Sequence, residues 1–160
     1  MSFPRLYPDF VDLLSSFLEE QVTFLLVGAF AVAANGVVRA TGDLDVWVRP
    51  DEENARRVWR ALSRFGAPLS DHRVLVSDFA APGTVYQMGL PPMRIDVLTH
   101  IDGVVFDQAW DARIVADVGG LVLPFLGRRE LIRNKRAAGR KKDLQDIELL
   151  REAGVPVDDP

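Results

Sequence analysis

Apolar residues in the first part of the chain recur at spacings that switch between helical and extended patterns. From Pro8 to Gln21 they lie three and four residues apart, as in an amphipathic helix, and Pro8 suits an early helical position. The segment Thr23–Val27 is a short apolar run ending in Gly28, which predicts a buried strand. The alanine-rich segment Phe30–Asn35 predicts a short helix that stops at an Asn-Gly pair.

The rest of the chain predicts further strands and helices in mixed order. Strands are expected at Asp43–Val48, Thr84–Met88, Arg94–Thr99 and Gly120–Pro124, and helices from Asp51 to Gly66, near Arg128–Ala138 and near Lys142–Glu152. The segment Val74–Phe79 fits either a strand or a short helix. This mixing predicts an α/β (α+β) fold in which a single mixed β-sheet of about five strands is flanked by helices. We expect one domain over residues 1–160, with a core at about 22–126 and a C-terminal helical segment at about 127–153.

Composition is that of a globular protein, with 48% hydrophobic and 26% charged residues. The chain has no cysteine, so neither a disulfide nor a thiolate metal site is possible. Charged residues interrupt the N-terminal segment, and the longest apolar stretch, Phe24–Ala34, is shorter than the ~20 residues that span a bilayer. We therefore expect a cytoplasmic protein that does not cross a membrane.

A basic segment, Arg128–Lys142, stands out against the net charge of -4. That net charge predicts no global attraction to nucleic acid. Within the segment, however, the only acid is Glu130. Clustered Lys and Arg supply sequence-independent affinity for phosphates. The segment is therefore either a solvated helix face or a platform for a triphosphate or an RNA acceptor.

Two carboxylates, Asp43 and Asp45, lie two residues apart in a predicted strand. Such residues project from one face, roughly 6.5–7 Å apart along the chain. Two like charges repel unless a cation lies between them, and Mg²⁺ prefers oxygen ligands. The pair therefore predicts a metal site, the alternative being two solvated acids on a strand edge. We place Trp47 on the opposite face of this strand.

A third carboxylate, Asp96, lies within the apolar segment Arg94–Leu98. A lone carboxylate in such a strand is costly unless it is paired or ligated. Asp96 is therefore either a third metal ligand, on a strand next to the first two acids, or the ion-pair partner of Arg94.

The residues before the acidic pair suit phosphate binding. Gly28 leads from a strand into a helix, whose free N–H groups and dipole favour phosphate, although a plain tight turn would also choose glycine. Arg39 is suited to meet a phosphate or a neighbouring acid, and Thr41 to fix the turn through its hydroxyl.

Together these motifs resemble the nucleotidyltransferase superfamily, in which a strand-Gly-helix element precedes an Asp-x-Asp strand and a third Asp follows on a later strand. The detailed pattern is similar to AbiEii-type and related small bacterial members from about Val27 to Leu150. It comprises Val27-Gly28-Ala29, Asn35-Gly36, Arg39-x-Thr41-x-Asp43-x-Asp45, Arg94-Ile95-Asp96-Val97-Leu98, Lys135 and Arg140-x-Lys142-Asp143-x-x-Asp146. The chain departs from the superfamily at Ala29, where members usually carry Ser or Gly.

The resemblance implies transfer of a nucleoside monophosphate from a nucleoside triphosphate to a tRNA, a protein side chain or a small molecule. It implies that Asp43 and Asp45 ligate Mg²⁺ (or Mn²⁺), and that Asp96 is a further ligand or the base that activates the acceptor hydroxyl. Phosphate contacts are expected from Gly28, Ala29, Arg39, Thr41, Lys135 and Lys142.

A non-catalytic function is the alternative. The three acids favour an enzyme, which could still belong to a toxin–antitoxin system. Ala29 favours a protein that keeps the fold but binds a protein partner, for instance as an antitoxin component. Asp143 and Asp146 share a face of a predicted helix, where with Lys142 they form a structural ion-pair network or border the site.

Overall fold

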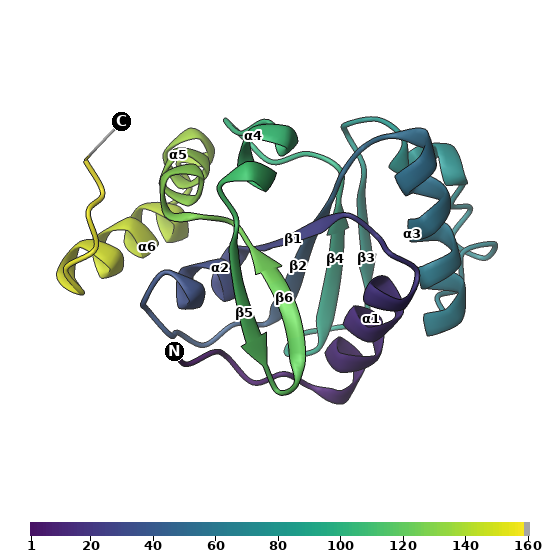
Figure 1. Ribbon diagram of the computed structural model, residues 1–160, viewed down its shortest axis with the longest axis horizontal. Helices are drawn as coiled ribbons and strands as arrows, with labels where there is room; N and C mark the ends of the chain where they lie inside the picture. Colours follow the sequence, from purple (N-terminus) through teal and green to yellow (C-terminus); the bar gives the residue numbers. More distant parts are fainter. Residues whose placement is uncertain (159–160) are drawn as a thin grey trace. The chain divides into compact units, whose positions relative to one another are not determined.

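The computed structural model describes residues 1–158 and has helices and strands in mixed order along the chain (Figure 1). The helices are α1 (Pro8–Glu19), α2 (Gly28–Ala34), α3 (Glu52–Phe65), α4 (Phe106–Asp111), α5 (Arg128–Ala138) and α6 (Lys141–Glu152), with a 3-10 helix η1 (Val76–Phe79). The strands are β1 (Phe24–Val27), β2 (Asp43–Val48), β3 (Val85–Met88), β4 (Arg94–Leu98), β5 (Ile114–Val118) and β6 (Leu121–Phe125). Within the described residues they form one mixed sheet in the order β3-β4-β2-β1-β6-β5.

The predicted fold class is therefore confirmed, with six strands in the described residues where about five were expected. The sequence patterns did not predict β5 or α4, and the ambiguous segment Val74–Phe79 contains η1. Between residues 1 and 158, no helix combines the length and the apolar character needed to span a bilayer.

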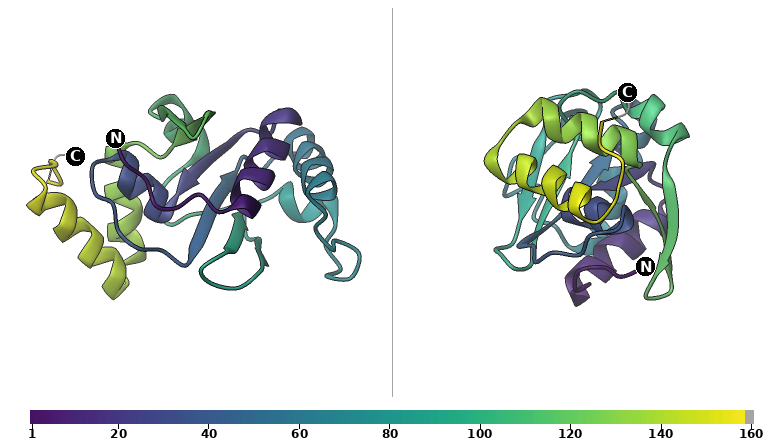
Figure 2. Two further views of the ribbon diagram at one scale, coloured as in Figure 1. Left: turned by 90° about the horizontal axis from the view of Figure 1, so that it is seen from below. Right: turned by 90° about the vertical axis from the view of Figure 1, so that its left-hand side faces the viewer.

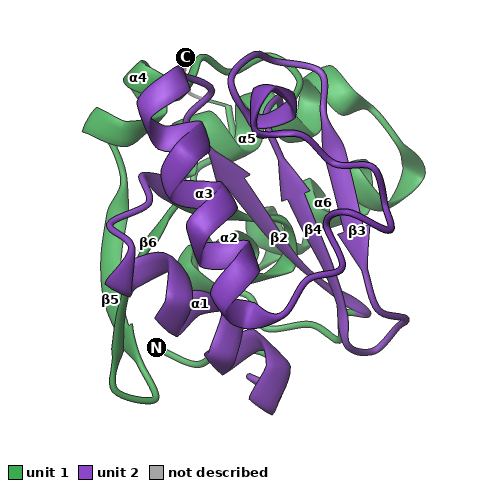
Figure 3. Ribbon diagram, turned by 90° about the vertical axis from the view of Figure 1, so that its right-hand side faces the viewer, with its two compact units in different colours: residues 1–4, 25–41, 101–160 green, residues 5–24, 42–100 purple. Residues whose placement is uncertain are grey.

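The chain divides into two compact units (Figure 3). Unit 1 comprises Met1–Pro4, Leu25–Thr41 and the described chain from Ile101 onward, whereas unit 2 comprises Arg5–Phe24 and Gly42–His100. Each unit contains three of the strands and is described by itself.

In unit 2, β4 pairs in parallel with β2 on one side and antiparallel with β3 on the other. Helices α1 and α3 pack together over one face of these strands (Figure 3). Leu44 and Ile95 are register partners and are almost fully buried, so the apolar face of β2 and β4 is the one that contributes to the core. Because strand residues alternate between faces, the polar residues of β2 and β4 share the other face.

In unit 1, β6 pairs in parallel with β1 and antiparallel with β5. Helices α5 and α6 lie side by side (Figure 2). The N-terminal segment is also part of this unit, because the ring of Phe3 stacks on that of Phe125 with centroids 5.1 Å apart. Helix α2 begins at Gly28, whose φ of 63° lies in the left-handed region that favours glycine.

Candidate metal centre

Three carboxylates converge on the polar face of β2 and β4. In the parallel register Asp43 lies opposite Arg94, and Asp45 lies opposite Asp96. One oxygen of each of Asp43, Asp45 and Asp96 lies within 4.8 Å of the others. The ladder between two strands thus brings together acids that are 51 residues apart along the chain, as the sequence pattern predicts.

Arg94 joins this cluster from the first position of β4. Its Nη2 donates a hydrogen bond to Oδ2 of Asp43 at 2.6 Å. Its Nε lies 3.3 Å from Oδ1 of Asp96, and its Nη2 lies 3.4 Å from Oδ2 of the same carboxylate. The ion pair with Arg94, expected as the alternative role of Asp96, is therefore present together with the carboxylate cluster. Nearby Asp96 and Asp43 raise the pKa of the Arg94 guanidinium.

Asp96 is the most buried of the three acids, with 6% of the residue exposed. Burial raises the pKa of its carboxyl, and the charge of Asp43 adds to this shift. Arg94 and the side chains of Asp45 and Gln87 oppose the shift without cancelling it. Among the described residues, no group makes a well-formed hydrogen bond to the buried Oδ1 of Asp96. A buried carboxylate oxygen without such a partner fits a metal ligand, because carboxylate oxygens are the ligands that Mg²⁺ and Mn²⁺ prefer.

Three other residues lie close to this cluster along the strands, and two of them were not singled out from the sequence. Gln87 of β3 is the register partner of Asp96 across the antiparallel ladder, which only the pairing of the β3–β4 hairpin reveals. Gly42 lies so close to the tip of that hairpin that a Cβ atom would come within 3.1 Å of Cβ of Pro91. Trp47 continues the alternation of Asp43 and Asp45 along β2, so it shares their face, and its prediction on the opposite face is wrong.

In unit 1, two of the residues expected to contact phosphate are held by one carboxylate. Arg39 binds Asp146 in a bidentate manner, with Nε at 2.6 Å and Nη2 at 2.9 Å. The ammonium of Lys135 lies 2.9 Å from Asp146 and 3.2 Å from Asp143, and only 3% of the residue is exposed. Lys135 is therefore occupied by two carboxylates and almost inaccessible to a phosphate from solvent.

The same buried network continues to the start of α6. Arg140 precedes the helix, and its guanidinium binds Asp143 with Nε at 2.7 Å. The network therefore consists of Arg39, Lys135, Arg140, Asp143 and Asp146, with both carboxylates almost fully buried. Burial by itself raises the pKa of Asp143 and Asp146. Hydrogen bonds and charges from Arg39, Arg140 and Lys135 outweigh it, so both pKa values are lowered.

These lowered pKa values predict a loss of stability in acid. A carboxyl whose folded pKa lies below its unfolded value of about 3.9 stabilises the fold fully above that value and ceases to do so as the pH falls through the folded pKa. The free energy of unfolding of wild type should therefore exceed that of Asp143→Asn at about pH 6, and the difference should shrink at about pH 3. Urea unfolding at both pH values measures this difference, and a gap that stays constant or widens in acid would contradict the assignment.

The remaining residues expected to bind phosphate lie in unit 1. Ala29 is 4% exposed and belongs to the seven-residue helix α2, which is too short to carry a large dipole. Thr41 is half-buried two residues before Asp43, and Lys142 is exposed in the first turn of α6. Of these residues, Lys142 is the most accessible to a ligand.

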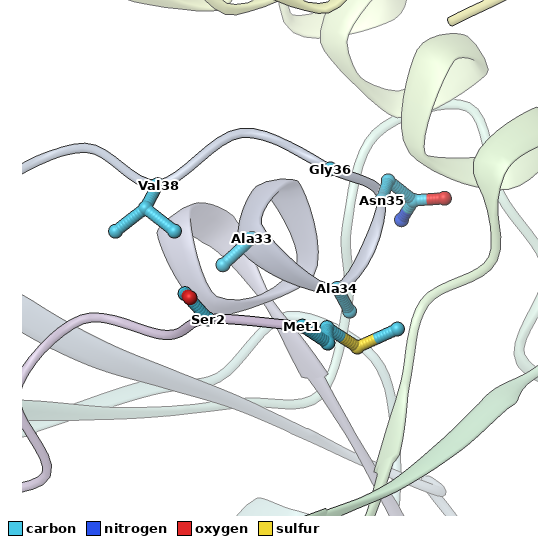
Figure 4. Close-up of a pocket in the computed structure, with 7 residues that line it drawn as sticks. All are labelled: Met1, Ser2, Ala33, Ala34, Asn35, Gly36 and Val38. Carbon is cyan, nitrogen blue, oxygen red and sulfur yellow. The ribbon is translucent and has the colours of Figure 1, made fainter.

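A pocket of about 660 Å³ lies in unit 1, beside the end of α2 (Figure 4). Its lining is formed by Met1, Ser2, Ala33, Ala34, Asn35, Gly36 and Val38. None of these side chains is charged, so we do not assign this pocket to a triphosphate or a metal ion.

The arrangement of strands and helices is a nucleotidyltransferase-like fold. A solved structure similar to it is that of a candidate nucleotidyltransferase from Thermotoga maritima, with a TM-score of 0.52 and 16% sequence identity. The similarity covers 92% of this chain and 94% of the Thermotoga chain. No protein-family model matches the sequence, and no curated protein matches it significantly. At this identity the structural likeness shows the fold alone.

Proposed function

We propose that this protein is a metal-dependent nucleotidyltransferase that moves a nucleoside monophosphate from a nucleoside triphosphate to a hydroxyl acceptor. One observation carries the proposal: the carboxylates of Asp43, Asp45 and Asp96 converge within 4.8 Å on one strand face. Like charges gathered in this way favour the binding of a cation, and metal-assisted phosphoryl chemistry uses such a gathering.

Asp43 and Asp45 are the proposed ligands of Mg²⁺ (or Mn²⁺), and Asp96 is a third ligand or the base for the acceptor. When bound, the metal ion would neutralise charge on the phosphates during displacement. The acceptor oxygen forms a bond to the α-phosphorus, the bond to the β-phosphate oxygen breaks, and pyrophosphate leaves. Asp96 lies beside the two proposed ligands, and as a base it would take the proton released by the acceptor hydroxyl.

The acceptor is proposed to be an RNA, a protein side chain or a small molecule, and the proposed compartment is the cytoplasm. Exposed basic residues of the segment Arg128–Lys142, such as Arg133 and Lys142, are the ones suited to approach an RNA backbone. Lys135 is less suited because it is buried between two carboxylates. Membership of the AbiEii-type group, and with it a toxin–antitoxin setting, rests on the sequence motifs.

The test is calorimetric titration of ATP, GTP, CTP and UTP in the presence of Mg²⁺. Wild type should bind at least one of the four, and the double variant Asp43→Asn, Asp45→Asn should bind none. Circular dichroism should show that the variant is folded. If folded wild type binds no nucleotide, or the double variant binds as tightly as wild type, the proposed site is incorrect.

A non-catalytic protein that binds a partner, such as an antitoxin component, is the second candidate. The observation that favours it is the ion pairing of Arg94 with Asp43 and Asp96, which supplies positive charge to the cluster without a metal ion. This candidate predicts a folded wild type with no affinity for Mg²⁺ or nucleotides, so the same titration distinguishes the two functions.

A further inference from the structure

Arg94 contacts the carboxylates through which a metal ion would be bound. It opens β4 directly opposite Asp43, and its guanidinium lies 2.6 Å from Asp43 and 3.3 Å from Asp96. A divalent ion bound to these two carboxylates would compete with the guanidinium for their negative charge. A metal ion and Arg94 would therefore both draw on the carboxylates of Asp43 and Asp96.

One N–H group of the guanidinium lacks a well-formed hydrogen bond. Its Nε is buried and, among the described residues, makes no well-formed hydrogen bond, although Oδ1 of Asp96 is nearby. An arginine cannot lose its proton under physiological conditions, so it can leave the carboxylates only by rotating away. Its side chain is 32% exposed, which leaves a path toward solvent.

We propose that Arg94 is an internal counter-ion that neutralises the carboxylate cluster until a divalent cation enters, and that the displaced guanidinium then binds the phosphates of the incoming nucleotide. This inference rests on the proposed metal and nucleotide site and assigns to it a triphosphate-binding side chain. Arginine suits this role because its planar donors match phosphate oxygens in a bidentate manner.

An exchange of this kind has a thermodynamic signature. Metal alone must displace Arg94 and therefore binds weakly, whereas a triphosphate gives the displaced guanidinium a new partner. Metal and triphosphate should consequently favour each other's binding, and this coupling is reciprocal. Removing Arg94 should shift the two affinities in opposite directions, because the metal loses a competitor and the triphosphate loses a ligand.

The experiment measures the binding of Mn²⁺ alone, and of inorganic tripolyphosphate with saturating Mg²⁺, to wild type and Arg94→Gln. The variant should bind Mn²⁺ about tenfold more tightly than wild type and tripolyphosphate about tenfold less tightly, within the usual range of such couplings. Arg57→Gln is the matched control, because Arg57 lies on α3 in the same unit and pairs with Glu53 at the surface. This control should change both affinities less than about twofold.

The outcomes separate this inference from the proposed function. One outcome is that wild type and Arg94→Gln bind Mn²⁺ equally tightly and that Asp45→Asn abolishes this binding. The metal site would then be supported, and the proposed role of Arg94 would be overturned. If Arg94→Gln bound neither Mn²⁺ nor tripolyphosphate, Arg94 would have a structural role, and the proposed exchange would be overturned. Absence of Mn²⁺ binding in both proteins would overturn the metal site itself, and the inference with it.

A measurement on wild type tests the same inference in case the Arg94→Gln variant does not fold. The Nε–Hε resonance of Arg94 can be assigned by its absence in Arg94→Lys, which keeps the charge of the side chain. Addition of Mg²⁺ should shift this resonance markedly, and tripolyphosphate should shift it again. A resonance that is unchanged while Mg²⁺ binds, as followed by calorimetry, would show that Arg94 stays on the carboxylates.

Discussion

Replacing Asp45 with Asn should lower the rate of nucleotidyl transfer about a thousandfold while leaving the protein folded. A bound metal stabilises transition-state charge by several kcal/mol, and each ~1.4 kcal/mol corresponds to a factor of ten in rate. The substitution should not destabilise unit 2, because it removes one of three like charges and leaves the contacts of Arg94 with Asp43 and Asp96 in place. The measurement combines label transfer from α-labelled nucleoside triphosphates with thermal unfolding.

A surface acid provides the matched control for this prediction. Asp12 is exposed on α1 in the same unit, so Asp12→Asn removes the same charge away from the cluster and should leave transfer unchanged. If the Asp45→Asn variant is folded and still transfers label at the wild-type rate, Asp45 is not part of the catalytic site. Unfolding of Asp45→Asn would instead give this carboxylate a structural role.

Replacing Asp146 with Ala should destabilise the protein by about 3–5 kcal/mol, which is the usual cost of removing one partner from a buried ion pair. Asp146 holds Arg39 through two hydrogen bonds and contacts the ammonium of Lys135, which is almost fully buried. The variant would leave Lys135 with Asp143 as its remaining carboxylate in the network, so part of a buried charge would be uncompensated. Urea unfolding at neutral pH measures the change.

The control for this second prediction lies two residues further along α6. Glu148 pairs with Arg151 at the surface, where an ion pair contributes less than about 1 kcal/mol, so Glu148→Ala should have a small effect. An Asp146→Ala variant as stable as Glu148→Ala would show that the buried network contributes little to the fold. The reason would then be that desolvation of the charges offsets their attraction.

Alternation and apolar runs were sufficient to predict most of the sheet. The apolar run Thr23–Val27 predicted β1, and the segment Asp43–Val48 predicted β2. The alternation along β2 also indicated that Asp43 and Asp45 share a face. Strand β5 was not predicted because apolar and polar residues do not alternate clearly along it. Val115, for example, is apolar although 55% of the residue is exposed. Helix α4 has only six residues, which is too few for a helical period to be recognised.

The three acids of the cluster and the pairing of Asp96 with Arg94 could be predicted from the sequence, but the contact of Arg94 with Asp43 could not. An acid in an apolar strand already indicated that Asp96 requires a cation or an ion pair, and the structure shows Arg94 in the second role. Lys135 belongs to a basic segment in the sequence, which gives no sign that it is buried. That burial depends on tertiary contacts with Asp143 and Asp146, which follow it by eight and eleven residues.

The register between β2 and β4 has a consequence for misfolded forms of the protein. If β4 were to slip by one residue, Ile95 and Val97 would turn toward the acids, and Asp96 would turn toward the apolar face that α1 and α3 cover. A molecule with a wrongly assembled cluster would thus also carry a charge in its core and expose apolar surface, the features that favour aggregation and degradation. Correct pairing of β2 with β4 and correct assembly of the carboxylate cluster are therefore one and the same requirement.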